Sequence, residues 1–526
     1  MAEYASIFND VLGPVMVGPS SSHTAASVRI GKALRQMVKG NVTYFQADFD
    51  PKGSLAASYI TQCSDVGLVG GLLGMEPTHE DLLRSIELAE AGGMTINFRI
   101  IPYEAEHPNT YRMIIRSDQK EEVTATALSV GGGMIAFTEI QGEPVTISGG
   151  FYETLIYGKS PTSAISDVTA YAEAKVPGFC QIEQRVADEK VFLNIKSHQP
   201  ITEEVLAGFK QFFQIDEVIA FDPVLPVMSQ KEKNVPFKTA EEMLQIAERD
   251  QLELWQLATM YESVRGNISE QQVYDKMADI VAIMGKGIEI GLKGTEYADR
   301  ILGYQSYKVG EHQAQMIGGT LTADIVAFIT AMMEVKSSMN VFVAAPTAGS
   351  CGALPGTVFA VAKEYNKSND EIIKAMLAAG IIGVFIAEYA TFAAEVAGCQ
   401  AECGAGSGMT AAALVQLMGG SARTAANAAS MALQNIFGMV CDPVDVRVEV
   451  PCLGKNMMCG MNALGAANMA IAGFDVVIPL DETIDSFDKV GRMIPPELRC
   501  TGLAGLAQTK TGLEISRQLA CRKGCC

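Results

Sequence analysis

The chain has 526 residues, of which 48% are apolar, and its formal net charge is −20 at pH 7. This length predicts several domains, and the apolar content is sufficient for a large core. The acidic balance argues against binding to nucleic acid or to an anionic membrane surface, both of which require a basic footprint. It leaves a small-molecule substrate open, because a local pocket can be basic on an acidic protein.

The first residues, "MAEYASIFNDVLGP", lack a basic stretch followed by an apolar run, so we expect no signal peptide. The longest strongly apolar segment without charge, residues 375–387, has thirteen residues, and a bilayer requires about 20. We predict that this segment and the uncharged residues 456–474 form buried helices of a cytoplasmic protein. Twelve cysteines in such a chain indicate metal binding or catalysis more than disulfides.

Residues 1–145 mix predicted strands and helices and are expected to form an α/β domain. The stretch "VTYFQADFD" (42–50) alternates as a strand does. Residues 111–117 and 121–130 predict adjacent strands, and residues 134–147 predict a further strand pair around a glycine-containing turn.

Residues 146–223 predict a small separate unit with the order βαββαβ, a ferredoxin-like arrangement. Strands are expected at 152–158, 179–186, 190–197 and 215–222, and helices at 160–175 and 202–213. The unit resembles an ACT domain, a small module that often binds amino acids. Ser160-Pro161-Thr162 stands where such domains usually have Pro-Gly, so ligand sensing and a role in dimerisation or packing are both open.

A linker is expected at residues 224–240. From 241 to 526 the pattern is helical almost throughout, and Gly- and Ala-rich segments favour close packing of helices that are apolar all round. The expected fold class is therefore α+β multidomain, with an N-terminal α/β domain, a small ferredoxin-like (ACT-like) domain and a large all-α C-terminal domain.

Three cysteines lie beside polar or proline-containing turns in this helical part. Cys399, Cys441 and Cys452 occur in "GCQAE", "CDPV" and "PC", and they are 42 and 11 residues apart. This spacing fits neither a zinc ribbon nor a thioredoxin motif. Thiolates from separated segments can hold an iron–sulfur cluster by three corners and leave one iron open for a substrate oxygen. Taken alone, the same triple is also typical of buried structural thiols.

These pieces, together with "VAAPTAGSCGALPG" (343–356), resemble the catalytic α domain of iron–sulfur-dependent L-serine dehydratases. Residues 8–35 are similar to the opening of the family's β part, and "LRCTGLAGLAQTKTG" (498–512) is similar to its closing segment. The resemblance implies conversion of L-serine to pyruvate and ammonia by a homodimer. It also implies a [4Fe-4S] cluster instead of pyridoxal phosphate, with the ligands Cys399, Cys441 and Cys452.

The motif "PSSSHT" (19–24) ends just before a predicted helix, where backbone N–H groups and the helix dipole favour an anion. A serine-rich helix cap is the alternative interpretation of this motif. The resemblance favours a substrate site, with His23 as the candidate for proton transfer or substrate orientation. The substrate-binding candidates are Ser20, Ser21, Ser22, His23, Thr24, Ser54, Thr347 and Ser350.

The chain departs from the family at residues 61–65, "TQCSD", where a Gly-His-Gly-Thr-Asp segment is usual. Gln62 stands in place of a histidine that is a candidate base, and glutamine cannot act as one. Either His23, Cys63 or Asp65 acts as the base, or the protein has a different substrate. The residues that we consider candidates for catalysis are His23, Ser64 and Asp65. A related lyase acting on another small substrate such as L-cysteine, and a non-catalytic amino-acid or redox sensor, stay open as alternatives.

The chain ends in "QLACRKGCC", and in some family members a C-terminal cysteine caps the free iron. Cys525 or Cys526 are candidates for that role, and a mobile tail with exposed thiols is the alternative. Cys351 and Cys403 are expected to be packing residues. The remaining histidines are expected to lie at the surface or to have satisfied partners: His79, His107, His198 and His312.

Overall fold

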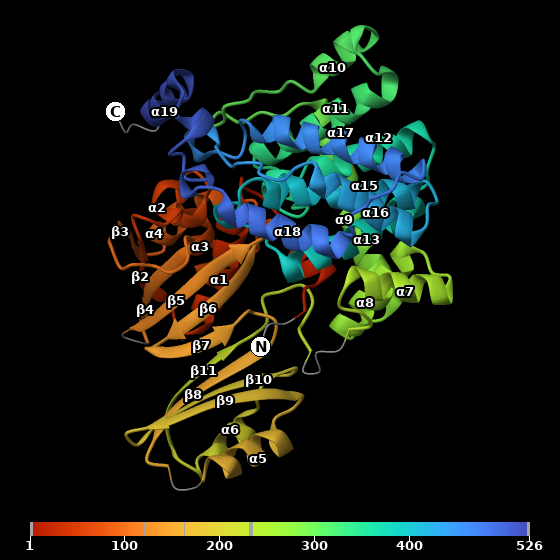
Figure 1. Ribbon diagram of the computed structural model, residues 1–526. Coiled ribbons are helices and arrows are strands. Elements are labelled where there is room, and N and C mark those ends of the chain that lie inside the picture. Colours follow the sequence, from red (N-terminus) through yellow and green to blue (C-terminus); the bar gives the residue numbers. More distant parts are fainter. Residues whose placement is uncertain (1–3, 120–121, 162–163, 231–234, 523–526) are drawn as a thin grey trace.

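The computed structural model describes residues 4–119, 122–161, 164–230 and 235–522. Two sheet-bearing units lie beside and below a large helical body in the view of Figure 1. The α+β multidomain class is confirmed, because the two larger sheets are formed by residues 42–221 and helices predominate from residue 240 onward.

The first sheet has six strands in the order β3-β2-β4-β5-β6-β7, and only β2 and β3 are parallel. Helices α1 (Ala26–Gln36) and α3 (Ser64–Leu72) pack closely together against this unit. The edge strand β3 was not predicted, although Ile96, Phe98 and Ile100 alternate with polar residues along it; as an edge strand it has no fully buried side chain. The strands are β2 (Val42–Phe49), β3 (Thr95–Ile100), β4 (Thr110–Ser117), β5 (Val123–Gly131), β6 (Met134–Ile140) and β7 (Glu143–Ile147).

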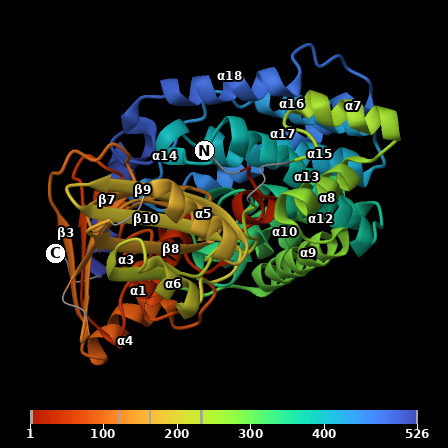
Figure 2. The same cartoon turned by 90° about the horizontal axis from the view of Figure 1, so that it is seen from below.

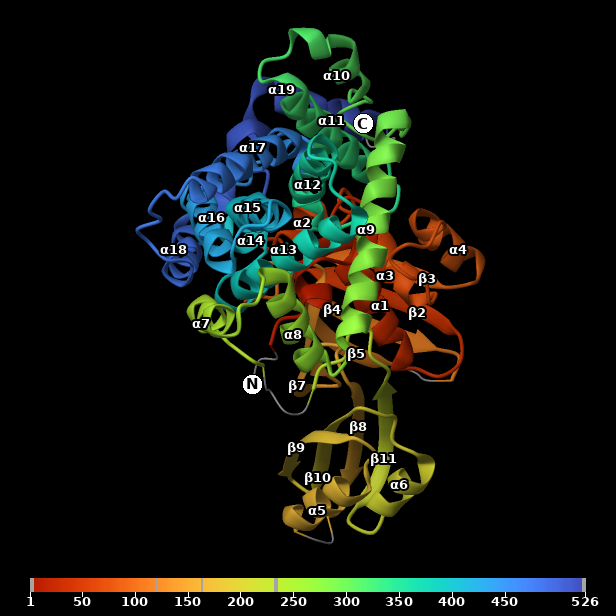
Figure 3. The same ribbon diagram turned by 90° about the vertical axis from the view of Figure 1, so that its right-hand side faces the viewer.

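The second sheet is antiparallel, with the strand order β11-β8-β10-β9, and the observed element order is the predicted βαββαβ. Figure 3 shows this unit projecting from the rest of the molecule. Leu155 and Phe192 pack into the core of the first sheet, so the two units share apolar contacts. The elements are β8 (Tyr152–Lys159), α5 (Ile165–Lys175), β9 (Phe179–Ala187), β10 (Lys190–Ser197), α6 (Glu203–Phe209) and β11 (Gln214–Phe221).

Helix α5 begins later than predicted. The pattern placed its start at Ser160, but Ser160 has a left-handed φ of 54° and its amide donates to the carbonyl of Glu189 in the turn between β9 and β10. Because a residue in that conformation cannot begin a helix, the helix begins at Ile165.

The helical body is built around α15 (Ala405–Leu417), in which every residue is buried. Helix α7 lies beside α16, and α8 lies beside α13 (Figure 2). The other helices are α7 (Ala240–Asp250), α8 (Leu254–Gly266), α9 (Glu270–Lys293), α10 (Tyr307–His312), α11 (Gly319–Ser337), α12 (Ala353–Glu364), α13 (Asn369–Tyr389), α14 (Ala394–Ala397), α16 (Ala422–Gln434), α17 (Cys452–Ile471), α18 (Leu480–Met493) and α19 (Lys510–Arg522).

The two uncharged segments, residues 375–387 and 456–474, differ in how deeply they are buried. Among the described residues, α13 is the one helix long and apolar enough to cross a bilayer, but 78% of its most apolar stretch is buried inside the molecule, as predicted for residues 375–387. The prediction of a buried helix at 456–474 was wrong in part, because α17 buries one face only and leaves Met458 about half exposed. Small side chains form the buried face of α17, whereas its methionines are partly buried or exposed. The buried residues are Cys452, Asn456, Cys459, Gly460, Ala463, Ala466, Ala467 and Ala470.

The start of the chain belongs to the helical core. A short helical turn, η1 (Ile7–Val11), packs on α13, and β1 (Val15–Met16) pairs antiparallel with the two-residue strand β12 (Phe342–Val343). The buried carboxylate of Glu262 in α8 accepts hydrogen bonds from the Ser6 hydroxyl at 2.5 Å and from the Ile7 amide at 2.8 Å. The predicted division at residue 145 groups these residues with the sheet, but their side chains pack among helices.

The packing of η1 predicts a stability effect at Ile7, which is fully buried and lies against Gly380 of α13. We expect Ile7→Ala to lower the free energy of unfolding by about 2–5 kcal/mol, because it leaves a cavity in a packed core. Denaturation followed by the fluorescence of the single tryptophan, Trp255 of α8, measures this. Ile317→Ala is the control, since Ile317 is 92% exposed, and equal effects of the two substitutions would contradict the packing.

Candidate active site

The serine-rich motif forms a buried turn that leads into α1. Ser20 caps the turn, because its hydroxyl accepts a hydrogen bond from the His23 amide at 3.3 Å. The helix-cap interpretation is therefore correct, but the cap faces the interior between the first sheet unit and the helical body. All five side chains of the motif are buried: Ser20, Ser21, Ser22, His23 and Thr24.

The His23 imidazole is held at both nitrogens. Nε2 lies 2.7 Å from the Ser58 hydroxyl, which itself donates to the carbonyl of Ser54. A hydroxyl has one proton, so Ser58 accepts from Nε2–H, and the lone pair of the neutral ring is on Nδ1. Nδ1 faces the hydroxyls of Ser20 and Ser22 at 3.1 Å each. Burial lowers the pKa of His23, so the ring is neutral at physiological pH.

Glu395 supplies the carboxylate of this network and was not found from the sequence. Its Oε1 lies 3.6 Å from Nδ1 of His23 and accepts a hydrogen bond from Ser22 at 2.9 Å. The carboxylate opposes the effect of burial on the pKa of His23, because it stabilises the imidazolium. Glu395 lies in α14, four residues before Cys399, and that spacing was the only signal in the sequence.

Unpaired polar atoms lie on neighbouring segments of the first sheet unit. The Ser54 hydroxyl, the Ser129 hydroxyl and both polar atoms of the Asn109 side chain are buried without a hydrogen-bond partner among the described residues. The Ser129 amide donates to the Asn109 carbonyl, and the Ser54 amide donates to the Pro108 carbonyl. Buried polar groups of this kind are normally paired, so these atoms are available to a polar ligand.

The three predicted cysteines are buried in the helical body. Cys399 and Cys441 lie in one cluster with three further thiols, whereas Cys452 lies in a separate apolar cluster, where burial and the charge of Cys399 raise its pKa. The sulfurs of Cys399 and Cys403 are 3.7 Å apart, and the Cys399 thiol also interacts with that of Cys441. The main chain of Cys441 is joined to the C-terminal segment by hydrogen bonds to Leu498 and Cys500. The sequence missed the additional members of this thiol cluster: Cys403, which was assigned to packing, Cys459 and Cys500.

The surroundings of these thiols favour a thiolate at Cys399 alone. The hydrogen bonds that Cys403 and Cys441 share with Cys399 raise the pKa of those two thiols, and burial raises the pKa of Cys452. Hydrogen bonds from Cys403 and Cys441 lower the pKa of Cys399 well below its usual value, and the charge of Lys455 acts in the same direction. Among the residues that the structure describes, no three Cys, His, Asp or Glu side chains surround a point closely enough for a single metal ion. A cubane cluster is larger than one ion and its ligands bind different irons, so it requires a wider set of sulfurs.

Gly398 holds the first motif in place. Its φ is 71°, and a Cβ at this position would lie 2.8 Å from the carbonyl oxygen of Met439. Only glycine fits that left-handed and crowded position. The motif "GCQAE" therefore turns Cys399 toward the segment that carries Cys441.

The loop at residues 346–350 connects the serine-rich turn to the thiol cluster. The Ala348 amide donates to the Ser21 hydroxyl at 3.3 Å, and the Thr347 hydroxyl donates to Glu402 Oε1 at 2.6 Å. The Ser350 hydroxyl is occupied by the carbonyl of Ala345. Burial raises the pKa of Glu402 to about 8, so this carboxyl holds a proton at neutral pH.

The other predicted site residues have different surroundings. The Ser64 hydroxyl lies 3.2 Å from the Tyr111 hydroxyl, and the Asp65 carboxylate accepts from the Val66 amide at the start of α3. Gln62 donates to the carbonyl of Val446 at 2.8 Å and to the Cys500 sulfur at 3.8 Å. Cys525 and Cys526 lie outside the described residues.

All four of the other histidines have nearby partners, as expected. His79 and His312 bond to main-chain groups within four residues, and His198 bonds to the Ser229 carbonyl. His107 is partly buried, and its Nδ1 accepts a hydrogen bond from the Asn109 amide at 3.1 Å. Burial lowers the pKa of His107, and the charge of Glu395 opposes this.

A buried imidazole beside a carboxylate thus lies close to a cluster of buried thiols, an arrangement of groups that enzyme sites use. Residues 249–507 match the serine dehydratase alpha chain family, and residues 7–139 match the serine dehydratase beta chain family. The chain belongs to the serine dehydratase family, with the beta-type part preceding the alpha-type part.

Named relatives cover both parts. The probable L-serine dehydratase alpha chain of Bacillus subtilis is 35% identical over 285 residues, which are 54% of this chain and 95% of that protein. The probable beta chain of the same organism is 34% identical over 219 residues, 41% of this chain and 97% of that protein. The L-serine dehydratase TdcG of Escherichia coli is 24% identical over 519 residues, 93% of this chain and 96% of that protein.

The buried carboxyl of Glu402 predicts a pH-dependent stability. Between pH 4.5 and about 8 the folded protein keeps a proton that the unfolded chain releases, so stability falls as the pH rises. Relative to Glu402→Gln, which cannot titrate, we expect the wild type to lose about 1.4 kcal/mol of unfolding free energy per pH unit in this window. Denaturation of both proteins, prepared alike, at a series of pH values tests this, and a constant difference would contradict it.

Proposed function

We propose that the protein is an iron–sulfur-dependent L-serine dehydratase, an ammonia-lyase that converts L-serine to pyruvate and ammonia. One observation carries the proposal: the His23–Glu395 pair and the buried thiol cluster meet across one interface in a chain of the serine dehydratase family. Serine dehydration requires removal of the Cα proton and departure of the hydroxyl, and the two halves of the site suit these two tasks.

The donor set suits a [4Fe-4S] cluster, with Cys399, Cys441 and Cys452 as its ligands. The three side chains are almost fully buried and come from separate segments, and soft thiolates are the ligands that iron–sulfur clusters take. Lys455 and the buried Lys336 are the cations whose charges act on these thiols. When bound, the cluster would supply a Lewis acid for the leaving hydroxyl, and the proposal includes no pyridoxal phosphate.

The residues of the chain would bind the substrate and move its proton. The unpaired polar atoms of Ser54, Asn109 and Ser129 are available to the substrate's carboxylate and ammonium groups. The lone pair of His23 Nδ1 would accept the Cα proton, and Glu395 would stabilise the imidazolium that forms. The resulting aminoacrylate tautomerises and hydrolyses to pyruvate and ammonia without further help from the protein.

Gln62 is the observation that favours a second candidate, a related lyase acting on another small substrate such as L-cysteine. Its side-chain amide is directed to Val446 and Cys500, so it joins the first sheet unit to the helical body. Assays of pyruvate and sulfide release from L-serine and L-cysteine distinguish the two candidates. Binding of serine without turnover of either substrate would instead favour a non-catalytic sensor.

The proposal also includes the domain boundaries, the ACT-like unit and the oligomeric state. The βαββαβ order and the strand order β11-β8-β10-β9 support an ACT-like unit within residues 146–223. We propose the remaining divisions as 1–145, 224–240 and 241–526, and a cytoplasmic homodimer as the working form.

The ligand assignment is tested at Cys441. Cys441→Ala removes one of three ligands, so we expect loss of the cluster absorbance and of serine dehydratase activity after anaerobic purification or reconstitution. Cys180→Ala is the control, because Cys180 lies in β9 of the small sheet unit, and it should keep both. A full cluster of about four irons per chain in Cys441→Ala would overturn the assignment.

The proton-transfer role is tested at His23. We expect His23→Gln to lower kcat by at least about 100-fold, because glutamine cannot accept the Cα proton. Since burial lowers the pKa of His23 from 6.5, kcat/KM of the wild type should fall only below pH 6.5, where the ring becomes protonated. His312→Gln is the exposed control and should retain activity. An acid limb that is unchanged in the His23 variant would contradict the role.

A further inference from the structure

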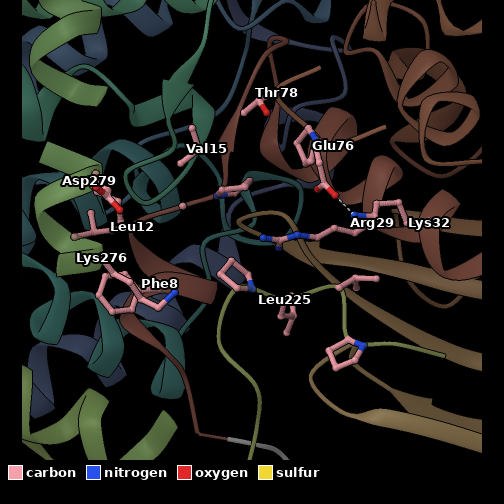
Figure 4. Close-up of a pocket in the computed structure, with 17 residues that line it drawn as sticks. Phe8, Leu12, Val15, Arg29, Lys32, Glu76, Thr78, Leu225, Lys276 and Asp279 are labelled. Carbon is pink, nitrogen blue, oxygen red and sulfur yellow. Dashed lines mark hydrogen bonds and ion pairs between the residues drawn. The ribbon is translucent and has the colours of Figure 1, made fainter. Parts of the chain in front are cut away.

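A second cavity lies apart from the site described above, with a volume of about 480 Å³. It is bounded by the N-terminal segment, by α1, by α9 and by the segment 223–226 that follows β11 (Figure 4). None of the residues that surround His23 or the thiol cluster lines it. The volume is in the range of sites for small metabolites.

Arg29 of α1 is the cationic group of this cavity. Its side chain is 4% exposed, and its guanidinium donates from Nη1 to the Gly133 carbonyl at 2.7 Å. Within the described part of the chain no carboxylate forms an ion pair with Arg29, and Nη2 and Nε have no hydrogen-bond acceptor. Burial lowers the pKa of Arg29 to about 10, against the raising effects of Asp10 and Glu76. A buried cation without a carboxylate in contact is unfavourable, so the guanidinium favours an anion from outside the chain.

The other charges of the lining balance one another. Lys32 forms an ion pair with Glu76, and the side chains of Lys276 and Asp279 carry opposite charges. Arg29 therefore leaves one net positive charge among the residues that line the cavity, and Asp10, which acts on Arg29 from outside the lining, forms no ion pair with it. The rest of the lining is mainly apolar and rich in proline: Leu12, Pro14, Pro77, Pro223, Leu225 and Ile280.

We propose that this cavity is an effector site for a small carboxylate with an apolar side chain, an amino acid or a 2-oxo acid. The ligand's carboxylate pairs with the free edge of the Arg29 guanidinium, and its side chain packs on the prolines and Leu225. An amino acid would also place its ammonium group near Asp279, whereas a 2-oxo acid would not use that carboxylate.

The residues around Arg29 connect this cavity to His23 and Glu395. The turn that Arg29 holds, residues 131–133, packs on the loop before Glu395, because a Cβ on Gly131 would lie 3.1 Å from the Cβ of Ala393. Helix α1 begins directly after the turn that carries His23. A ligand that shifts the Arg29 side chain would therefore shift the segments that carry His23 and Glu395. The segment 223–226 connects the same cavity to the small sheet unit.

Isothermal titration of the full-length protein with L-leucine, 4-methyl-2-oxopentanoate and L-leucinamide tests the site. We expect at least one of the two carboxylates to bind once per chain and to change kcat/KM for L-serine, and the amide, which lacks the carboxylate, not to bind. Binding of leucine alone indicates a role for Asp279, and binding of both indicates recognition of the carboxylate. The titration requires no turnover, so it succeeds or fails independently of the proposed dehydratase activity.

Two substitutions remove the site by different means. Arg29→Met removes the charge and should weaken carboxylate binding by at least about tenfold, and Leu225→Trp should block binding by filling the cavity. Arg35→Met is the matched control on the same helix, because the Arg35 guanidinium donates to the carbonyls of Val38 and Gly40 and does not line the cavity. Failure of both carboxylates to bind, binding that is insensitive to Arg29→Met and Leu225→Trp, or binding without an effect on kcat/KM would overturn the proposal.

Discussion

The contact between the start of the chain and the helical body is the constraint on which the site depends. Residues 7–16 are inserted among helices by apolar burial and by the pairing of β1 with β12. Because the serine-rich turn follows within a few residues, this insertion fixes where His23 lies. Hydrogen bonds from Ala348 to Ser21 and from Ser22 to Glu395 then join the turn to the helical body.

Burial has a different effect on each ionisable group of the site, because their neighbours differ. His23 becomes neutral, since burial disfavours its cation more than Glu395 favours it. Glu402 keeps its proton, since burial and then the negative charge of Cys399 both disfavour its anion. Cys399 itself becomes the most acidic thiol, since other thiols donate hydrogen bonds to it. One dry interface thus provides a base, a carboxylic acid and a thiolate at the same pH.

Gln62 connects three parts of the structure at this interface. Its side-chain amide donates to the Val446 carbonyl and the Cys500 sulfur, and its main-chain carbonyl accepts from the Thr24 hydroxyl. The residue therefore links the serine-rich turn, the first sheet unit and the C-terminal segment. In this arrangement the imidazole of His23, with Glu395 beside it, is the basic group that the network positions.

The sequence by itself determined the features that depend on local pattern. Alternation of polar and apolar residues predicted most strands of both sheets, and the succession of strand-like and helix-like periodicity predicted the βαββαβ order. The turns beside Cys399, Cys441 and Cys452 indicated that these thiols were candidate ligands. Only the tertiary structure decided that Glu395 faces His23, that Cys403, Cys459 and Cys500 join the thiol cluster, and that the start of the chain packs among helices. It also decided that no carboxylate of the described residues forms an ion pair with Arg29. These features are contacts between segments that are often hundreds of residues apart, and a local pattern contains no information about which distant segment will cover a side chain.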